Sequence, residues 1–267
     1  MVHALTPRAE PAGPLAGLGI LVTRPARQAA GFAQKVAALG GNPVIFPGIA
    51  ILPPADPAAL GRAHDALPAY DVAIFVSANA VEHGAPDPRR WPARLVVLAP
   101  GPGTAEALAE VGLAGARIPA TTFDSEGLLA LPELAEVRGK RVVIFRGDGG
   151  REHLGDALAA RGALVDYVAC YRRARPAGGI AGLAEAFGEG RIDAVTITSS
   201  EGLDNLWSLA DGAVRAAWRA CPTFVPHPRI AGHARDLGLA VVATAGGDAG
   251  LLAGLLEWAA AQPREKS

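Results

Sequence analysis

The sequence of 267 residues contains only two cysteines, Cys170 and Cys221, and no CxxC pair. Two cysteines are too few for a disulfide framework, and no Cys/His cluster has the spacing that zinc sites use. We therefore expect no metal site, and we expect the protein to act in a reducing compartment, the cytoplasm.

The chain also lacks an excess of charge of either sign. Its formal net charge is −1, which argues against a general nucleic-acid binder and against a polybasic protein of membrane surfaces. Lysine is scarce, because only Lys35, Lys140 and Lys266 are present and arginine supplies the other cations. Codon bias explains this most simply, although the planar guanidinium also suits the recognition of carboxylates and phosphates.

No segment has the length and composition of a membrane-spanning helix. The longest uncharged run, residues 36–55, contains four prolines and three glycines, which a continuous helix does not accommodate. Residues 1–17 lack the apolar centre of a signal peptide, and we interpret them as a flexible leader. Half of the residues are hydrophobic, so the rest of the chain is expected to fold around a sizeable core.

The pattern of residues 141–171 predicts a strand, a turn, a helix and a second strand. Residues 142–145 (VVIF) form a continuous apolar run, as in a strand that is buried on both faces of a parallel sheet. The turn is predicted at residues 148–150 (DGG). Arg146 then lies at the carboxyl end of the first strand, where open α/β sheets bind ligands. Tyr171 ends the second strand, either as a core aromatic or with its hydroxyl facing a cleft.

Strands that alternate with helices along the rest of the chain predict parallel sheets with right-handed crossovers. One sheet of about ten strands would be unusually wide, so we expect two sheets of about five strands each. The predicted parts are a discontinuous domain 1 (18–48 and 176–262), an inserted domain 2 (55–168) and two linker strands (49–54 and 169–175). A cleft between two such domains is a common place for a small-molecule site.

Three predicted helix starts carry glycines or hydroxyl side chains directly after a strand, at Ser77-Ala78, Gly103-Thr104 and Ser199-Ser200. Free N–H groups at a helix start can hold an anion. A hydroxyl at such a place also serves as a helix cap, and Thr104 is the candidate cap of the second start. The stretch GPGTAE at 101–106 lacks the third glycine of the dinucleotide fingerprint, and no GxxxxGK[ST] loop is present, so a nucleotide site is weakly supported.

The ordered motifs of the chain are VTRP at 22–25, FVSANAV at 75–81, GPGTA at 101–105, the 146–171 stretch and ITSS at 197–200. Their order and spacing resemble the uroporphyrinogen-III synthase family over about residues 18–260. The chain departs from the pattern where many members carry a second GxxTA-like helix start. It reads VPHPRIA at 225–231, where we expect His227 or Arg229 to supply the contact.

This resemblance implies an α/β protein with two flavodoxin-like domains of parallel sheets, joined by a two-stranded linker. It implies a reaction without a cofactor, in which hydroxymethylbilane loses water and closes with ring D inverted, through a spiro intermediate, to uroporphyrinogen III. The product is the precursor of haem, sirohaem and cobalamin. Tyr171 matches the tyrosine proposed as a general acid in this family. The substrate-binding residues that we predict are Thr104, Gly103, Ser77, Ala78, Ser199, Ser200 and His227, with Arg24 and Arg146 added from their positions at strand ends.

The expected partner is hydroxymethylbilane, handed over transiently by hydroxymethylbilane synthase, and the family suggests a monomer without nucleic-acid or membrane partners. Two alternatives stay open. One is a two-domain binding protein of the periplasmic type, against which the missing signal peptide argues. The other is a nucleotide-dependent α/β enzyme, against which the incomplete glycine fingerprint argues. Fold alone does not separate the three.

Overall fold

The computed structural model describes residues 13–150 and 152–262. The first twelve residues of the predicted leader therefore lie outside the described residues. The chain divides into two compact units, unit 1 with Met1–Ala50 and Arg175–Ser267, and unit 2 with Ile51–Ala174. Unit 1 is thus built from both ends of the chain, and unit 2 is inserted into it.

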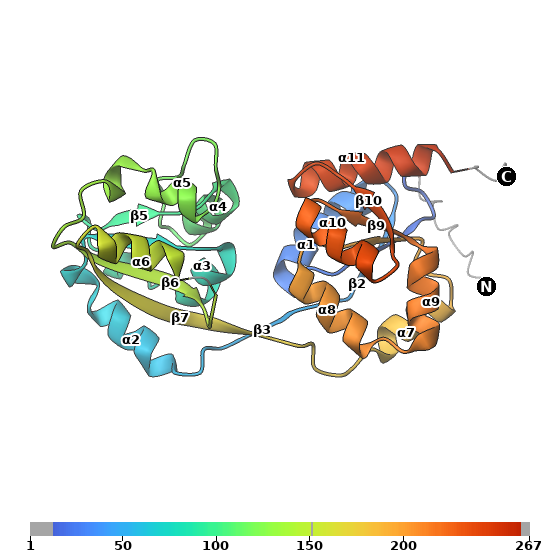
Figure 1. Cartoon of the computed structure of the whole chain (residues 1–267), viewed down its shortest axis with the longest axis horizontal. Helices are drawn as coiled ribbons and strands as arrows, with labels where there is room; N and C mark the ends of the chain where they lie inside the picture. The colour runs from blue at the N-terminus through green and yellow to red at the C-terminus, as the bar shows by residue number, and fades with distance from the viewer. Residues whose placement is uncertain (1–12, 151, 263–267) are drawn as a thin grey trace, which may run out of the picture. The chain divides into compact units, whose positions relative to one another are not determined.

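Unit 1 contains a five-stranded sheet in the order β10-β9-β8-β1-β2 (Figure 1). Its strands are β1 (Gly19–Val22), β2 (Asn42–Ile45), β8 (Ala194–Thr196), β9 (Pro222–Val225) and β10 (Ala240–Ala243). Its helices are α1 (Ala26–Ala38), α7 (Ala181–Gly188), α8 (Ser200–Leu209), α9 (Gly212–Ala220), α10 (Pro228–Asp236) and α11 (Gly247–Ala260). The neighbouring strands pair in parallel. Counted within the unit, the order is 2-1-3-4-5, which is the flavodoxin-like order.

Helices cover both faces of this sheet. In β1, Ile20 and Val22 pack with buried residues of α1 and α11, whereas Leu21 packs with those of α7 to α10. Successive side chains of a strand point to opposite faces. A strand that is covered on both faces therefore consists of apolar residues without alternation, as β1 does.

Unit 2 contains the second five-stranded sheet, in the order β3-β7-β6-β4-β5. Its strands are β3 (Ala50–Leu52), β4 (Val72–Phe75), β5 (Val96–Leu98), β6 (Arg141–Gly147) and β7 (Leu164–Ala174). Its helices are α2 (Pro57–Asp65), α3 (Ala78–Gly84), α4 (Pro102–Glu110), α5 (Ser125–Leu129) and α6 (His153–Ala160), with short 3₁₀ turns at Leu67–Ala69, Pro88–Arg90 and Pro132–Leu134. Strand β4 pairs in parallel with β5 and β6, and β6 pairs in parallel with β7.

Strands β5, β4, β6 and β7 occupy the first four places of the flavodoxin-like order, and β3 takes the edge place beside β7. Both of these neighbouring strands reach the division between the units, which falls between Ala50 and Ile51 and between Ala174 and Arg175. They form the two-stranded linker. The predicted fold class, two parallel α/β sheets joined by such a linker, is confirmed.

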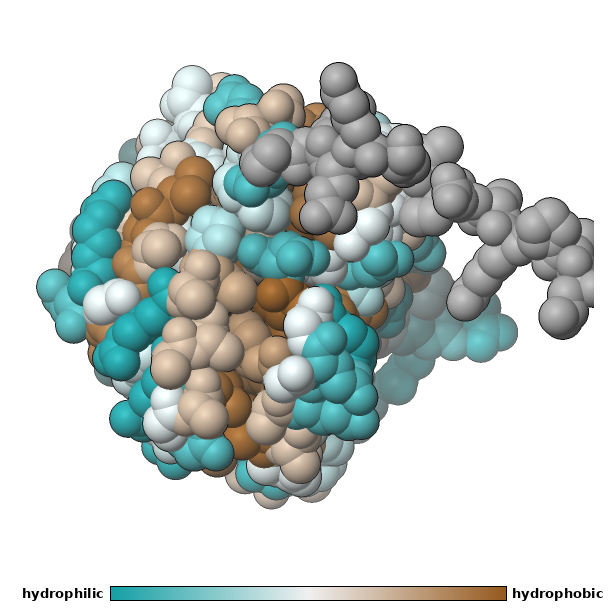
Figure 2. Space-filling model, turned by 90° about the vertical axis from the view of Figure 1, so that its right-hand side faces the viewer, coloured by the Kyte–Doolittle hydropathy of each residue, from teal (hydrophilic) through white to brown (hydrophobic). Residues whose placement is uncertain are grey.

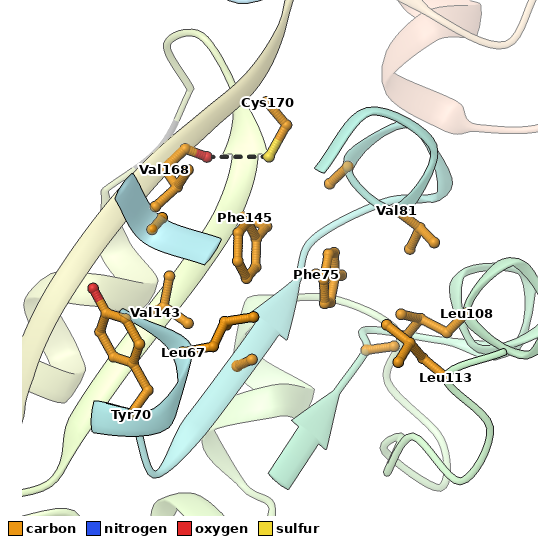
Figure 3. Close-up of a cluster of buried hydrophobic side chains, with 14 of the residues drawn as sticks. Leu67, Tyr70, Phe75, Val81, Leu108, Leu113, Val143, Phe145, Val168 and Cys170 are labelled. Carbon is orange, nitrogen blue, oxygen red and sulfur yellow. Dashed lines mark hydrogen bonds between the residues drawn. The ribbon is translucent and has the colours of Figure 1, made fainter. Parts of the chain in front are cut away.

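The larger core cluster of unit 2 lies between its sheet and helices α2, α3 and α4 (Figure 3). Phe75 and Phe145 are opposite each other in the register of β4 and β6, and their rings stack with centroids 4.6 Å apart. Both rings are fully buried. A second cluster, with Leu128 of α5 and Leu154 of α6, covers the other face. The sheet of unit 2 is therefore packed on both faces, and this packing fixes the positions of the carboxyl ends of its strands.

Figure 2 shows one face of the molecule, where hydrophilic residues flank a band of apolar residues. Across the part of the chain that the structure describes, none of the helices is long and apolar enough to span a bilayer.

Candidate functional site

Ser77, Arg146 and Tyr171 lie together at the end of the unit 2 sheet that is formed by the carboxyl ends of its strands. Ser77 follows β4, Arg146 is the penultimate residue of β6, and Tyr171 lies in β7. The hydroxyl oxygens of Ser77 and Tyr171 are 3.3 Å apart, and either can donate the hydrogen bond. Two residues that are 94 positions apart in the sequence thus form one polar contact.

Tyr171 is buried, with 4% of its surface exposed. Its ring lies against the backbone of Gly147, where the pairing of β6 with β7 shifts register and Gly147 stands opposite Tyr171. A Cβ atom on Gly147 would lie 2.7 Å from Cζ of Tyr171 and 3.0 Å from its hydroxyl oxygen. Glycine is therefore required at position 147 for the ring to lie as it does. The ring belongs to the core cluster while the hydroxyl reaches Ser77, so the interpretation of Tyr171 as a core aromatic is confirmed.

A cavity of about 290 Å³ opens beside this contact, within unit 2. Its polar lining includes Ser125, Arg146, Tyr167, Tyr171 and Arg173. The guanidinium of Arg146 lies over the ring of Tyr167, with its Cζ 4.6 Å from the ring centroid. The same arginine donates a hydrogen bond to the carbonyl of Gly149 in the turn after β6. The cavity therefore combines a phenol hydroxyl with arginine side chains.

Ser77 has a second role as the N-cap of α3. Its hydroxyl oxygen accepts a hydrogen bond from the backbone N–H of Ala80 at 3.1 Å. Ala78 is the first residue of the helix and is half-buried. The cap holds the Ser77 side chain close to Tyr171, so local helix geometry and the site geometry depend on the same side chain.

The interpretation of Thr104 as a helix cap is wrong. Helix α4 begins at Pro102, its N-cap is Gly101, and no side chain caps it. Proline is favoured at the first helical position because its missing N–H would be unpaired there anyway. Thr104 lies inside the first turn and is buried, with 8% of its surface exposed. Gly103 is exposed, and a Cβ atom there would meet nothing within 4 Å. The helix start is therefore accessible to solvent at Gly103.

In unit 1, Ser199 caps α8 as predicted. Its hydroxyl oxygen accepts a hydrogen bond from the backbone N–H of Gly202 at 3.2 Å. Ser200 is the first residue of the helix, and both serines are half-buried. The preceding strand β8 ends beside β1, where Thr23 donates a hydrogen bond to the carbonyl of Thr196 at 2.8 Å. The Thr23 hydroxyl is thus used within the fold.

Arg24 follows β1 and is paired inside the protein. It forms a salt bridge with Asp248 near the start of α11, and its Cζ lies 5.0 Å from the ring centroid of Phe32. Lys35 also binds Asp248, at 2.8 Å. Partial burial acts to raise the pKa of Asp248, but the hydrogen bonds from Lys35 and Arg24 together outweigh it and hold that pKa below its usual range. The charge of Arg24 is therefore already balanced by a carboxylate.

His227 is the N-cap of α10, and its Nδ1 accepts a hydrogen bond from the backbone N–H of Arg229 at 3.2 Å. The imidazole is exposed. At the point where the chain departs from the pattern that it resembles, an imidazole caps the helix start, as the hydroxyls of Ser77 and Ser199 do at theirs.

The structure brings part of the predicted set together. Ser77 and Tyr171 are in contact, and Arg146 shares a cavity with Tyr171, whereas Arg24, Ser199 and His227 belong to unit 1.

The cavity also includes side chains that were not predicted as site residues, among them Ser125, Tyr167 and Arg173. Tyr171 shares the core face with Val168 and Cys170, and the register shift between Arg146 and Gly147 interrupts the alternation of side chains along β7. No spacing in the sequence therefore places Tyr167 and Tyr171 at one cavity.

Chemically, the site can donate hydrogen bonds and hold negative charge. A phenol and an alcohol in contact can pass a proton to an oxygen that lies beside them, and guanidinium groups bind carboxylates in a planar fork.

Comparison with known proteins shows which family the chain resembles. The family model described as "Uroporphyrinogen-III synthase HemD" matches residues 30–249. The uroporphyrinogen-III synthases of Salmonella typhimurium and Escherichia coli are each 35% identical to this chain over 226 residues, which is 83% of this chain and 92% of either relative.

Two solved structures share the fold. A uroporphyrinogen III synthase from Thermus thermophilus superposes with a TM-score of 0.57 at 23% identity, covering 91% of this chain and 99% of its own. The Helicobacter pylori uroporphyrinogen-III synthetase gives a TM-score of 0.59 at 12% identity, covering 90% of this chain and 99% of its own. On the family model and the two relatives of 35% identity, the chain belongs to the uroporphyrinogen-III synthase family.

Proposed function

We propose that this chain closes hydroxymethylbilane to uroporphyrinogen III, with loss of water and inversion of ring D through a spiro intermediate. Membership of the family supports the reaction. The observation that carries the assignment of residues is the contact between the hydroxyls of Tyr171 and Ser77 at the strand ends of unit 2. The product feeds the synthesis of haem, sirohaem and cobalamin.

The chemistry of the substrate defines what the protein has to supply. Hydroxymethylbilane loses its hydroxyl readily and closes by itself to the symmetric isomer I. Catalysis must therefore favour attack by the substituted carbon of the last ring over attack by its free carbon. Holding the two reacting ends in one geometry is the main task, and intramolecular positioning of this kind can contribute about 7–11 kcal/mol to a barrier.

Tyr171 is assigned the role of assisting departure of the hydroxyl. A phenol can donate its proton to the departing hydroxyl as the C–O bond breaks. The contact with Ser77 holds the hydroxyl in one direction, because Ser77 is itself fixed by capping α3.

The variant Tyr171→Phe keeps the ring and removes the hydroxyl. We expect kcat to fall by about a hundredfold, the lower end of general acid catalysis, with KM little changed. A matched control is Tyr70→Phe, because Tyr70 is a buried tyrosine of the same core cluster whose hydroxyl donates to Asp166 at 2.7 Å. Full turnover by Tyr171→Phe would remove the assigned role, and an equal loss in Tyr70→Phe would show that the effect is structural.

Binding is assigned to helix starts and arginines. The substrate carries eight carboxylates, and backbone N–H groups at helix starts and guanidinium groups both bind such anions. The proposed binding residues are Ser77, Ala78, Gly103, Thr104 and Arg146 in unit 2, and Arg24, Ser199, Ser200 and His227 in unit 1. Arg24 forms a salt bridge with Asp248, so we expect it to contribute less to substrate binding than Arg146 does.

The reaction is tested by adding freshly generated hydroxymethylbilane, oxidising the products to porphyrins and separating isomers I and III. Isomer III above a no-enzyme control supports the proposal, and isomer I alone from folded protein overturns it. A monomer, a cytoplasmic location and transient hand-over from hydroxymethylbilane synthase complete the proposal. Sedimentation at the mass of one chain tests the first of these.

A further inference from the structure

We propose that Arg146 and Tyr167 form a carboxylate-binding subsite in unit 2, in which Tyr167 positions the guanidinium for one acidic side chain of the substrate. The identity of the ligand rests on the proposed function, which supplies a substrate rich in carboxylates. Tyr167 acts through Arg146 and is a positioning residue.

Tyr167 is an exposed aromatic side chain that is nevertheless fixed. It leaves 38% of its surface exposed. Its hydroxyl donates to the carbonyl of Glu152 at 2.9 Å and accepts from the N–H of Gly155 at 2.9 Å. A Cβ atom on Gly155 would lie 2.2 Å from that hydroxyl oxygen. The ring is thus held by β7 at one end and by the start of α6 at the other.

This fixed ring carries Arg146. The guanidinium carbon lies 4.6 Å from the ring centroid, within the range of a cation–π contact. One hydrogen bond to the carbonyl of Gly149 sets its rotation. A guanidinium has five N–H donors, so a single hydrogen bond within the protein leaves donors for a ligand. The side chain also lines the cavity of about 290 Å³.

The charge of Arg146 is not balanced nearby. Among residues 13–150 and 152–262, no salt bridge involves Arg146, and the described lining of the cavity contains Arg146 and Arg173 but no Asp or Glu. A guanidinium without an ion pair, beside a cavity whose described lining holds no acidic residue, favours an anion in that cavity.

The same strand contains a natural comparison. Arg141, at the other end of β6, lies over Tyr70 with its Cζ 4.7 Å from the ring centroid. There the charge is balanced within the protein, because Arg141 also pairs with Asp166 at 3.2 Å. The two stacks share their geometry and differ in the carboxylate. The guanidinium of Arg141 has a carboxylate partner within the protein, whereas in our proposal a carboxylate of the ligand is the partner of Arg146.

The size of the cavity indicates what binds there. Ligand pockets measure about 300–1,000 Å³, so a cavity of about 290 Å³ lies at the small end of that range. It fits one acetate or propionate side chain of a pyrrole ring. The subsite therefore holds an acidic substituent of the substrate through Arg146, and this contact fixes the register of the bound chain.

The test compares Arg146→Gln and Tyr167→Leu with Arg141→Gln in steady-state assays with hydroxymethylbilane. Both variants of the subsite should raise KM by about tenfold, the loss of a hydrogen bond between charged groups, with kcat changed less than about twofold. Tyr167→Phe keeps the ring that stacks on Arg146 and removes both hydrogen bonds of the hydroxyl. It should raise KM by less than Tyr167→Leu does. Arg141→Gln should leave KM unchanged. Thermal unfolding establishes that each variant is folded.

A KM within about twofold of wild type for Arg146→Gln would overturn the subsite, as would an equal rise in Arg141→Gln. A lowered kcat with unchanged KM in Tyr167→Leu would overturn the positioning role.

The affinity for uroporphyrin III, measured by fluorescence titration, provides a readout without turnover, and it should weaken in the same two variants. If wild type forms no isomer III, the proposed function fails. If wild type forms isomer III and the variants bind as well as it does, only the subsite fails.

Discussion

The substitution Gly147→Ala tests how the structure positions Tyr171. The added Cβ atom would lie 2.7 Å from Cζ and 2.8 Å from Cε2 of the tyrosine ring. Separations below 3 Å between such atoms do not occur in folded proteins. The ring is rigid and buried, so either the ring or the end of β6 has to move.

Overpacking a filled core lowers the free energy of unfolding by about 1–3 kcal/mol, and we expect a loss of this size for Gly147→Ala. For a chain of this size, each kcal/mol lowers Tm by about 2–4 °C. The movement also takes the hydroxyl of Tyr171 away from Ser77, which it now contacts at 3.3 Å. We expect kcat to fall toward the value of Tyr171→Phe, by up to about a hundredfold.

The assay measures kcat and the isomer ratio for wild type, for each single variant and for Gly147→Ala with Tyr171→Phe. If Gly147→Ala acts through the tyrosine, its effect on kcat should be much smaller when the hydroxyl is already absent. Gly61→Ala is the matched control, because Gly61 lies in α2 and a Cβ atom there meets nothing within 4 Å. Additive effects of the two substitutions, or wild-type kcat for Gly147→Ala, would refute the reasoning.

Three further predictions concern the fold. Phe145→Ala removes a fully buried ring that stacks on Phe75 and should lower the free energy of unfolding by about 3–5 kcal/mol in denaturant titrations, whereas a loss below 1 kcal/mol would contradict the packing. Asp248→Asn removes a carboxylate whose pKa is held low by its cationic partners against partial burial. The stabilisation is present above the unfolded-state pKa of about 3.9 and is lost as the pH falls through the lower folded-state pKa, so the variant should be less stable by about 1 kcal/mol or less at pH 7 and equal to wild type in strong acid. Burial raises the pKa of Cys170 to about 12, so its thiol should resist iodoacetamide at pH 8 until the protein unfolds, and rapid labelling of Cys170 in folded protein would contradict its burial.

Local features of the chain could be predicted because their causes are local. The apolar run of β6, the glycine turn after it and the capping serines Ser77 and Ser199 depend on residues within a few positions of each other. Thr104 was interpreted wrongly although a local signal existed. Pro102 favours the first helical position, which moves the cap to Gly101.

The rest of the site depends on contacts that sequence spacing does not determine. The shift of register between Arg146 and Gly147 places Tyr171 opposite a glycine, and only the paired strands reveal it. Arg24 and Asp248 are 224 positions apart and meet through the tertiary fold. Arg24 was therefore predicted to bind substrate without knowledge that Asp248 is its partner within the protein.

The central claim is that the protein directs closure of hydroxymethylbilane against a spontaneous reaction. The most direct measurement is the fraction of isomer III formed as the concentration of enzyme is raised at a fixed concentration of substrate. Our account predicts that isomer III rises to saturation at the expense of isomer I, while the total porphyrin stays constant. A fraction of isomer III that does not depend on the amount of folded protein would contradict it.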